Sequence, residues 1–241
     1  MPMFSPYELL KVLRESLQLR EDDYVVLKVY RETRDPFKVI VAAILSQNTT
    51  EANAFAAYYR LEETVGVDPD AILAAEPGVI ESAIRVAGLQ RQKARAIREL
   101  ARLVARGLDL RALACMEADE ARAVLSSVPG LGQKTADVFL ALFKGGVIPV
   151  DTHVRRVARR LGLTDSSTYE GVRQDLESFF PPELRLEAHL YLIALGRKYC
   201  KARAPRCSQC PLRDTCPLAR EFLTHSVTTE KGLKTKYGNL L

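Results

Sequence analysis

The sequence predicts an all-α protein of about ten helices with short connections. Apolar residues recur at spacings of three and four, which is the period of one face of an α-helix. No stretch alternates apolar and polar residues convincingly, and 147–150 is too short for a strand and contains a proline. The helical spacing is present in the stretches 7–17, 37–45, 97–104, 121–128, 135–143 and 184–195.

Local signals mark the ends of several helices. Asp35 and Asp68 each precede a proline, which is the order of an N-cap followed by proline at the first helical position. Gly88 and Gly107 follow periodic apolar stretches, as glycines at helix C-termini do. Cys115 lies in an apolar run and is expected to be a small buried side chain.

The size and charge of the chain restrict its class. With 241 residues it can bury the core of one large or two modest domains. No apolar stretch approaches the twenty residues of a membrane span, and the N-terminus does not have the pattern of a signal peptide. Clustered thiols then indicate the reducing interior of a cell. A net charge of +5 and a pI of about 9.0 suit a polyanionic partner without establishing one.

Basic side chains are concentrated in three runs. Residues 85–111 contain eight lysines and arginines against two acids, 155–160 contain four arginines, and 197–206 contain five basic residues and no acid. A single run could be a solvated helix face. Three runs that flank the motifs below favour a surface that binds phosphate.

Four of the five cysteines lie in one short basic segment, with the pattern Cys-x6-Cys-x2-Cys-x5-Cys. Four thiolates are the ligands that a [4Fe–4S] cluster requires. A zinc ribbon pairs two Cys-x2-Cys knuckles and often uses histidine, but here there is one knuckle, and His189 and His225 lie outside the run. The pattern favours the cluster, with zinc and disulfides as alternatives. The ligands would be Cys200, Cys207, Cys210 and Cys216.

A second motif is Val-Pro-Gly-Leu-Gly-Gln-Lys-Thr-Ala at 128–136. It predicts a helix through 121–127, a tight turn, and a second helix over 134–143. Gly130 and Gly132 allow turn conformations and close approach of another molecule. The N–H groups that open the second helix could bind a phosphate. A plain corner between two helices is the alternative.

Lys134 and Asp151 are the candidate chemical groups. The helix dipole disfavours a cation in the first turn, where Lys134 lies. Cationic surroundings favour the neutral amine, which is a nucleophile. Asp151, in the segment Val-Asp-Thr-His, is expected to cap the next helix, and capping does not prevent its carboxylate from also facing the lysine.

The hairpin, the Val-Asp-Thr-His segment and the cysteine loop occur in the same order in the endonuclease III family, which this chain resembles from about residue 35 to 216. These are helix–hairpin–helix DNA glycosylases of base excision repair. The segments 45–50 and 88–94 are also similar to the family's, where they contribute residues that enter the DNA stack or line the lesion pocket. The resemblance implies that Lys134 attacks C1′ and forms a Schiff base, that Asp151 accepts a proton, and that β-elimination cuts the strand 3′ to the site.

The resemblance also implies a set of DNA contacts. Asn48 and Leu89 would be the wedges that fill the gap left by the extruded nucleotide, although a shift of one residue would make Gln47 the wedge. The family's pyrimidine enzymes usually have Gln and Asp where this chain has Asn48 and Glu51, which weakens the assignment of the base. The other implied DNA contacts are Gln90, Gly130, Gly132, His153, Arg203 and Arg206, and the implied pocket residues are Ser46 and Glu51.

The implied architecture is two helical domains that flank a DNA-binding groove. One would be residues 35–146, and the other 1–34 with 147–225, followed by a loosely structured tail, 226–241. The [4Fe–4S] cluster would be structural, presenting 201–206 to phosphate, or would sense redox state. We expect a prokaryotic, cytoplasmic, nucleoid-associated monomer that binds duplex DNA with a damaged base or an abasic site. The few asparagines and the excess of Arg over Lys are typical of a thermophilic source.

Lysine at position 134 favours oxidised pyrimidines such as thymine glycol as substrates, because the monofunctional mismatch glycosylases of the family generally lack it. A monofunctional mismatch glycosylase is one alternative. A second is a non-catalytic module that only binds DNA, which would leave Lys134 and Asp151 unexplained.

Overall fold

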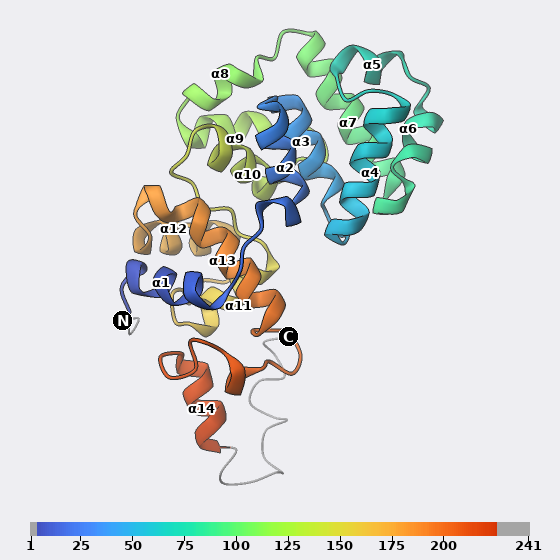
Figure 1. The fold of residues 1–241 in the computed structure, drawn as a ribbon. Helices are drawn as coiled ribbons and strands as arrows, with labels where there is room; N and C mark the ends of the chain where they lie inside the picture. The colour runs from blue at the N-terminus through green and yellow to red at the C-terminus, as the bar shows by residue number, and fades with distance from the viewer. Residues whose placement is uncertain (1–3, 226–241) are drawn as a thin grey trace. The chain divides into compact units, whose positions relative to one another are not determined.

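The computed structural model describes residues 4–225, which are helical nearly throughout and contain no strand (Figure 1). The all-α prediction is confirmed. The predicted tail, 226–241, lies outside the described residues. The α-helices are α1 (Pro6–Ser16), α2 (Val25–Thr33), α3 (Pro36–Leu45), α4 (Glu51–Thr64), α5 (Pro69–Ala74), α6 (Pro77–Ala83), α7 (Gln90–Ala105), α8 (Leu110–Cys115), α9 (Ala118–Ser126), α10 (Gln133–Phe143), α11 (Thr152–Arg160), α12 (Tyr169–Phe179), α13 (Arg185–Lys198) and α14 (Pro217–His225). Short 3-10 helices are η1 (Glu21–Asp23), η2 (Arg85–Ala87), η3 (Pro182–Leu184) and η4 (Cys207–Gln209).

The chain divides into two compact units. One is continuous, Arg20–Val147, and the other combines Met1–Leu19 with Ile148–Leu241. The sequence predicts residues 20–34 as part of the second of these. They belong to the first, because α2 packs against α3.

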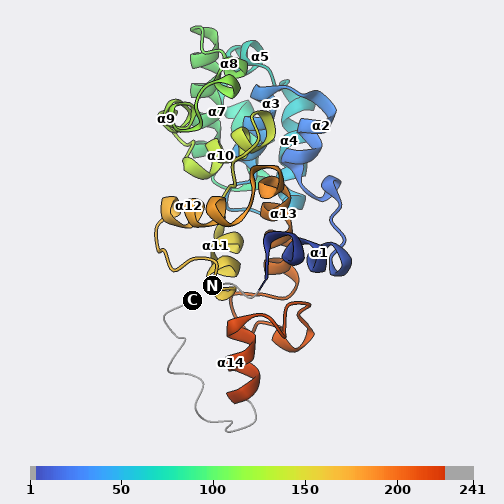
Figure 2. The ribbon, with the colours of Figure 1, turned by 90° about the vertical axis from the view of Figure 1, so that its left-hand side faces the viewer.

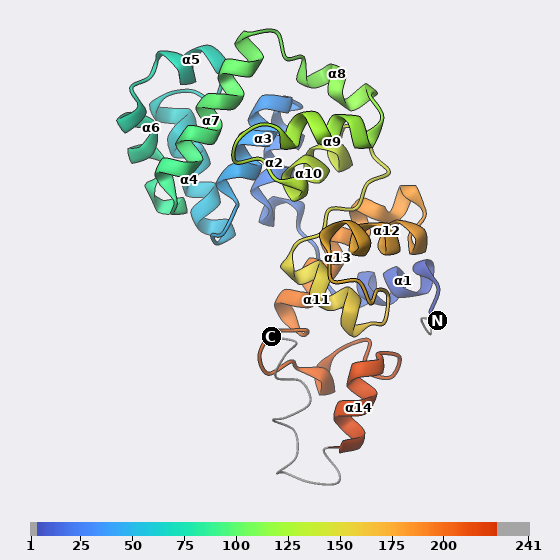
Figure 3. The ribbon, with the colours of Figure 1, turned by 180° about the vertical axis from the view of Figure 1, so that it is seen from behind.

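Helix α3 is the centre of the continuous unit. Every residue of α3 except Lys38 is buried, and α2, α4, α7, α8 and α10 pack around it. A helix that is apolar on all sides requires such a complete cover. Asp35 begins the helix as expected, since its side chain accepts a hydrogen bond of 2.9 Å from the Lys38 N–H. Seen from behind, α9 and α10 lie side by side next to α3 (Figure 3).

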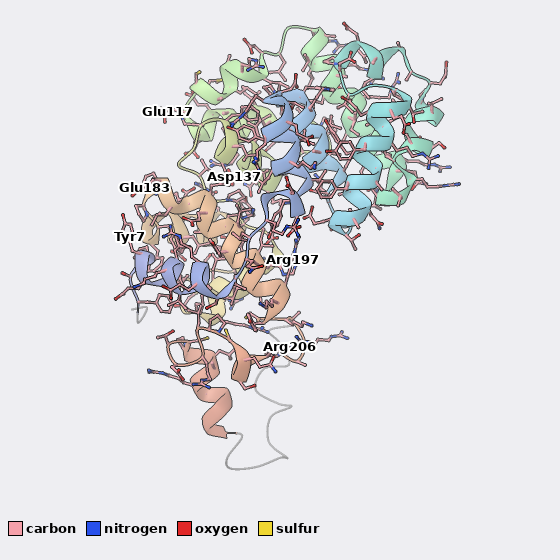
Figure 4. The ribbon with its side chains drawn as sticks, in the orientation of Figure 1. Tyr7, Glu117, Asp137, Glu183, Arg197 and Arg206 are labelled. Atoms are coloured by element: carbon pink, nitrogen blue, oxygen red, sulfur yellow. The ribbon has the colours of Figure 1, made fainter. Side chains whose placement is uncertain are left out.

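The two helices α9 and α10 are joined by a buried ion pair. Arg122 of α9 donates from Nε to the Asp137 carboxylate of α10 over 2.7 Å, and Asp137, labelled in Figure 4, is fully buried. Arg122 also bonds the Asp119 carboxylate. Removing one partner of such a pair leaves an uncompensated charge, at a cost of about 3–5 kcal/mol. The pair therefore fixes how the two helices of the hairpin meet.

The discontinuous unit holds the N-terminal helix against the C-terminal half of the chain. Helix α1 begins with a capping box of Ser5 and Glu8 and lies beside α13 (Figure 2). Arg14 makes two hydrogen bonds with the Glu187 carboxylate, of 2.5 and 2.7 Å. Tyr7 donates to Glu183 over 3.2 Å, and both are labelled in Figure 4.

Cys115 corrects one expectation. It was predicted to be buried, but it is exposed at the last position of α8. The helix is only six residues long, so it buries little more than Leu110 and Leu113 and turns its other residues outward. No helix among residues 4–225 is both long and apolar enough to cross a membrane.

Candidate active site

The turn between α9 and α10 uses its two glycines differently. Gly130 has a φ of 91°, and a Cβ there would lie 2.6 Å from the Ala96 Cβ on α7. Only glycine satisfies both the left-handed backbone and this close approach. Gly132 caps α10 with an ordinary φ of −88°, and no atom lies within 4 Å of where its Cβ would be. Gly130 is therefore required for the turn itself, whereas Gly132 leaves open space next to its own backbone.

The N-terminus of α10 carries Lys134 at its second position, half-buried. The N–H groups of Thr135 and Ala136 donate hydrogen bonds of 2.9 and 3.1 Å to the Gly132 carbonyl. The N–H groups that open a helix carry partial positive charge. The predicted turn and second helix are present, with the helix starting at Gln133, one residue earlier than expected.

The loop after α3 leads to this turn. The Gln47 side chain donates from Nε2 to the Thr135 hydroxyl (3.0 Å) and the Gly130 carbonyl (3.3 Å). Asn48 is exposed and has a left-handed φ of 52°. Gln47 is thus bonded to the hairpin, whereas Asn48 is exposed, and which of the two acts as a wedge stays a prediction.

Leu89 is the other predicted wedge. It precedes α7 with a φ of 50°, and 48% of it is exposed, which is unusual for a large apolar side chain. Gly88, with a φ of 70°, allows the sharp entry into this loop. Gln90, the first residue of α7, is half-buried beside it.

The two predicted pocket residues make local hydrogen bonds. Ser46 donates its hydroxyl to the Ala43 carbonyl over 2.9 Å, and the Glu51 carboxylate accepts from the Val25 N–H at the start of α2 over 3.3 Å. Both are half-buried. Their role toward a damaged base stays a prediction.

Asp151 is in the other unit, at the start of α11. Its Oδ1 accepts a hydrogen bond of 2.7 Å from the Val154 N–H, so the predicted N-cap is present. Oδ2 takes no part in this cap, and the residue is half-buried. The carboxylate is thus held in place through one oxygen by its own helix.

His153 lies on α11 where α13 comes close. A Cβ on Gly196 would lie 3.0 Å from the His153 Cβ, so the glycine allows the two helices to approach. Burial lowers the pKa of His153, against the opposing charge of Asp151 and with the charges of Arg156 and Arg197. Its Nδ1 lies 3.0 Å from the Arg156 guanidinium.

Helix α11 also supports the cysteine loop. Arg156 donates from Nε to the Cys200 carbonyl over 2.9 Å. Arg160 donates to the carbonyls of Lys201 (2.7 Å) and Ala202 (3.1 Å), with Nη1 3.5 Å from the Cys200 sulfur. Three hydrogen bonds to backbone carbonyls thus fix the segment that begins at Cys200.

The four thiols of the loop suit an iron–sulfur cluster. None of them is in a disulfide, and the described residues contain no group of three or more His, Cys, Asp or Glu side chains placed to hold a metal ion. Burial, with a smaller contribution from the neighbouring sulfurs, raises the pKa of Cys210 to about 11. Burial also raises the pKa of Cys207 and of Cys216. Because buried thiolates require compensating positive charge, iron ions would supply what the loop lacks.

Not every residue in the three basic runs faces outward. Lys93 is buried, Arg98 donates to the carbonyls of Ile72 and Ala75, and Arg156 and Arg160 bind the cysteine loop. Arg203 and Arg206 are exposed on that loop, where Figure 4 labels Arg206. The surface available for phosphate is therefore smaller than the sequence indicated, because backbone carbonyls at helix ends attract the same cations.

Comparison with known proteins decides the family. The model of the HhH-GPD superfamily of base excision DNA repair proteins matches residues 41–182, and that of the iron–sulfur binding domain of endonuclease III matches residues 200–219. The chain belongs to the endonuclease III family. It is an enzyme of base excision repair, a DNA glycosylase. Its metal centre is a [4Fe–4S] cluster, which sets zinc and disulfides aside, and the enzyme assignment sets aside a non-catalytic module.

The chain is similar to named members of the family over most of its length. It is 41% identical over 207 residues to endonuclease III of Sulfolobus acidocaldarius, covering 85% of this chain and 92% of that one. To endonuclease III of Escherichia coli K12 it is 32% identical over 182 residues, covering 75% and 83%. A trapped covalent intermediate of endonuclease III with DNA superposes with a TM-score of 0.71 at 29% identity, covering 92% of this chain and all of that one.

The glycine pair can be separated by mutation. Gly130→Ala should lower the free energy of unfolding by about 1–3 kcal/mol, because the methyl group meets Ala96 and the backbone is left-handed. Gly132→Ala should keep stability within about 1 kcal/mol yet weaken binding to duplex DNA, because its methyl group would lie beside the α10 N–H groups. Urea unfolding and fluorescence anisotropy measure the two effects. Binding by Gly132→Ala as tight as wild type would remove the hairpin as the phosphate site.

The cluster gives a second prediction. Purified protein should absorb broadly in the visible range and contain about four irons per chain. Cys210→Ser should lose the iron and the absorbance, because the loop then lacks one of four ligands. Cys115→Ser, an exposed thiol of the other unit, is the matched control and should keep both. Stoichiometric zinc in a colourless wild-type protein would contradict the assignment.

Proposed function

We propose that this enzyme removes oxidised pyrimidines of the thymine glycol type and cuts the strand 3′ to the resulting abasic site. Lys134 would be the nucleophile and Asp151 the proton acceptor. The observation that carries the proposal is the position of Lys134, at the opening of α10 directly after a turn that leaves space beside Gly132. A covalent endonuclease III–DNA intermediate, as named for the related structure, requires such a nucleophile.

The chemistry balances with these two residues. The neutral Lys134 amine attacks C1′ of the deoxyribose, and the N-glycosidic bond breaks with its electron pair leaving on the base, which takes up a proton. Opening of the sugar ring gives a Schiff base between Nζ and C1′. Loss of a proton from C2′ then expels the 3′ phosphate, and water releases the lysine.

Asp151 suits the role of proton acceptor and charge stabiliser. Its cap hydrogen bond through Oδ1 holds the carboxylate still, and Oδ2 remains outside that bond. A carboxylate fixed in this way can take the proton that the attacking amine loses and can stabilise the positive charge that develops at the sugar. The positioning comes from the start of α11 and needs no further group.

The DNA contacts divide between the two units. Asn48 and Leu89, both exposed, would enter the stack in place of the extruded nucleotide. The N–H groups of α10, together with Arg203 and Arg206 on the cysteine loop, would bind phosphates of one duplex. Gln90 and His153 would make further contacts, and Ser46 and Glu51 would line the pocket. We expect the enzyme to act as a monomer.

Covalent trapping tests the nucleophile. With a duplex that contains thymine glycol or an abasic site, borohydride should reduce the Schiff base and leave a stable enzyme–DNA adduct. Lys134→Ala should abolish the adduct and strand cleavage but keep most DNA affinity, because phosphate contacts elsewhere supply it. Lys144→Ala, an exposed lysine just beyond the other end of α10, is the matched control. Trapping by Lys134→Ala at the wild-type rate would place the nucleophile elsewhere. Trapping absent from wild type would favour a monofunctional glycosylase.

The role of Asp151 is tested separately from its cap. Asp151→Asn should keep the start of α11, because Asn caps as well as Asp. Single-turnover base excision should nevertheless fall by about a hundredfold or more, as for a lost acid–base group. Asp68→Asn, at the N-cap of α5, is the control for a cap substitution without chemistry. Equal excision rates for the two variants would limit Asp151 to capping.

A further inference from the structure

Lys93 is a buried cation that the proposed chemistry does not use. It lies in the first turn of α7 and only 3% of it is exposed. Lysines are almost never buried to this extent unless the ammonium is paired, because removing a charge from water is costly. Burial lowers the pKa of Lys93 to about 8, so the ammonium is still the major form at neutral pH.

The ammonium of Lys93 bonds the ends of two helices. Nζ donates to the Leu45 carbonyl and to the Ala87 carbonyl, each over 2.9 Å. Leu45 is the last residue of α3 and Ala87 the last of η2. Carbonyls at helix C-termini lack partners within their helix and carry partial negative charge, so both favour a cation. One nitrogen therefore joins two chain segments that are distant in the sequence.

Both segments continue into exposed residues with a left-handed backbone. Asn48 follows Leu45 by three residues and has a φ of 52°, and Leu89 follows Ala87 by two residues and has a φ of 50°. Asn adopts this conformation readily, whereas it costs Leu89 about 1–2 kcal/mol. Such conformations persist only where the surroundings fix them. The two Lys93 hydrogen bonds act on the chain immediately before each of these residues.

We propose that Lys93 is a positioning residue that holds Asn48 and Leu89 together as one rigid wedge for the DNA stack. This inference rests on the proposed function, because it assumes that the two residues fill the gap left by an extruded nucleotide. A wedge fixed before binding loses less conformational entropy when it enters the duplex. Lys93 touches neither DNA nor the reacting atoms in this account and acts only through the two loops.

The test separates base extrusion from chemistry. Lys93→Met keeps the length of the side chain and removes both hydrogen bonds. Its single-turnover excision of thymine glycol from duplex DNA should fall by about tenfold to a hundredfold, as expected for a misplaced positioning group. Its cleavage of an abasic site in single-stranded DNA should stay within about threefold of wild type, because no nucleotide has to be extruded there. Lys38→Met, which removes a lysine paired with Glu62 in the same unit, is the matched control.

A double-mutant cycle adds a readout that a purely structural lysine would not change. In a Leu89→Ala background, where part of the wedge is already lost, Lys93→Met should cost clearly less than in wild type. If Lys93→Met does not give folded protein by circular dichroism and cluster absorbance, Lys93→Leu, which also removes both hydrogen bonds, takes its place in both assays.

Three results would overturn the proposal: unchanged duplex excision, equal losses on duplex and single-stranded substrates, or full additivity with Leu89→Ala. Failure of the proposed function would be distinguishable, because wild-type protein would then form no borohydride adduct. Normal trapping by wild type with any of the three results refutes the role of Lys93 alone.

Discussion

The burial of α3 is the constraint on which the continuous unit depends. A helix without a polar face cannot remain at a surface, so α2, α4, α7, α8 and α10 must surround it. That cover fixes where α3 ends, and its end carries the loop with Gln47 and Asn48. The same packing brings α7 and α10 to α3, and with them Leu89 and Lys134. The candidate groups of this unit are thus positioned by apolar contacts made on other faces of their helices.

In the discontinuous unit, α11 positions candidate functional residues at both of its ends. Its first turn is capped by Asp151, and Arg160 at its last position bonds the cysteine loop. The loop from 200 to 216 buries little apolar surface, with Leu212 and Cys216 as its buried side chains. Burial alone therefore cannot order it. Bonds from four thiolates to the cluster, together with the α11 arginines, supply the constraint that a hydrophobic core supplies elsewhere.

Much of the fold followed from the sequence, because helical periodicity and caps are local properties. Asp35, Asp68 and Asp151 cap their helices as expected. Properties that depend on packing could not be predicted from the sequence. Lys93 was counted among surface cations although it is buried, and Cys115 was expected to be buried although it is exposed. The environment of Lys93 depends on residues far away in the sequence. Cys115 is exposed because its helix is too short to bury it.

The sequence predicts which residue types form the candidate site, but it predicts their arrangement in space only in part. The order of hairpin, Asp151 and cysteines carried the family assignment. In the sequence, both Gly130 and Gly132 fit a turn equally well. Their roles differ because only at Gly130 would a Cβ collide with Ala96. The different surroundings of Gln47 and Asn48 likewise depend on hydrogen bonds from Gln47 to a segment more than eighty residues away.

The pairing of α1 with α13 has a consequence for how the chain is made. Leu9, Leu10 and Leu13 are buried in the finished protein, yet α13, against which α1 packs, begins only at Arg185. At a synthesis rate of about 5–20 residues per second, the apolar face of α1 stays unpacked for roughly 10–30 s until α13 has been synthesised. The continuous unit has all of its residues available before then. Helix α1 therefore precedes the continuous unit in synthesis but can pack in its final place only after that unit has been made.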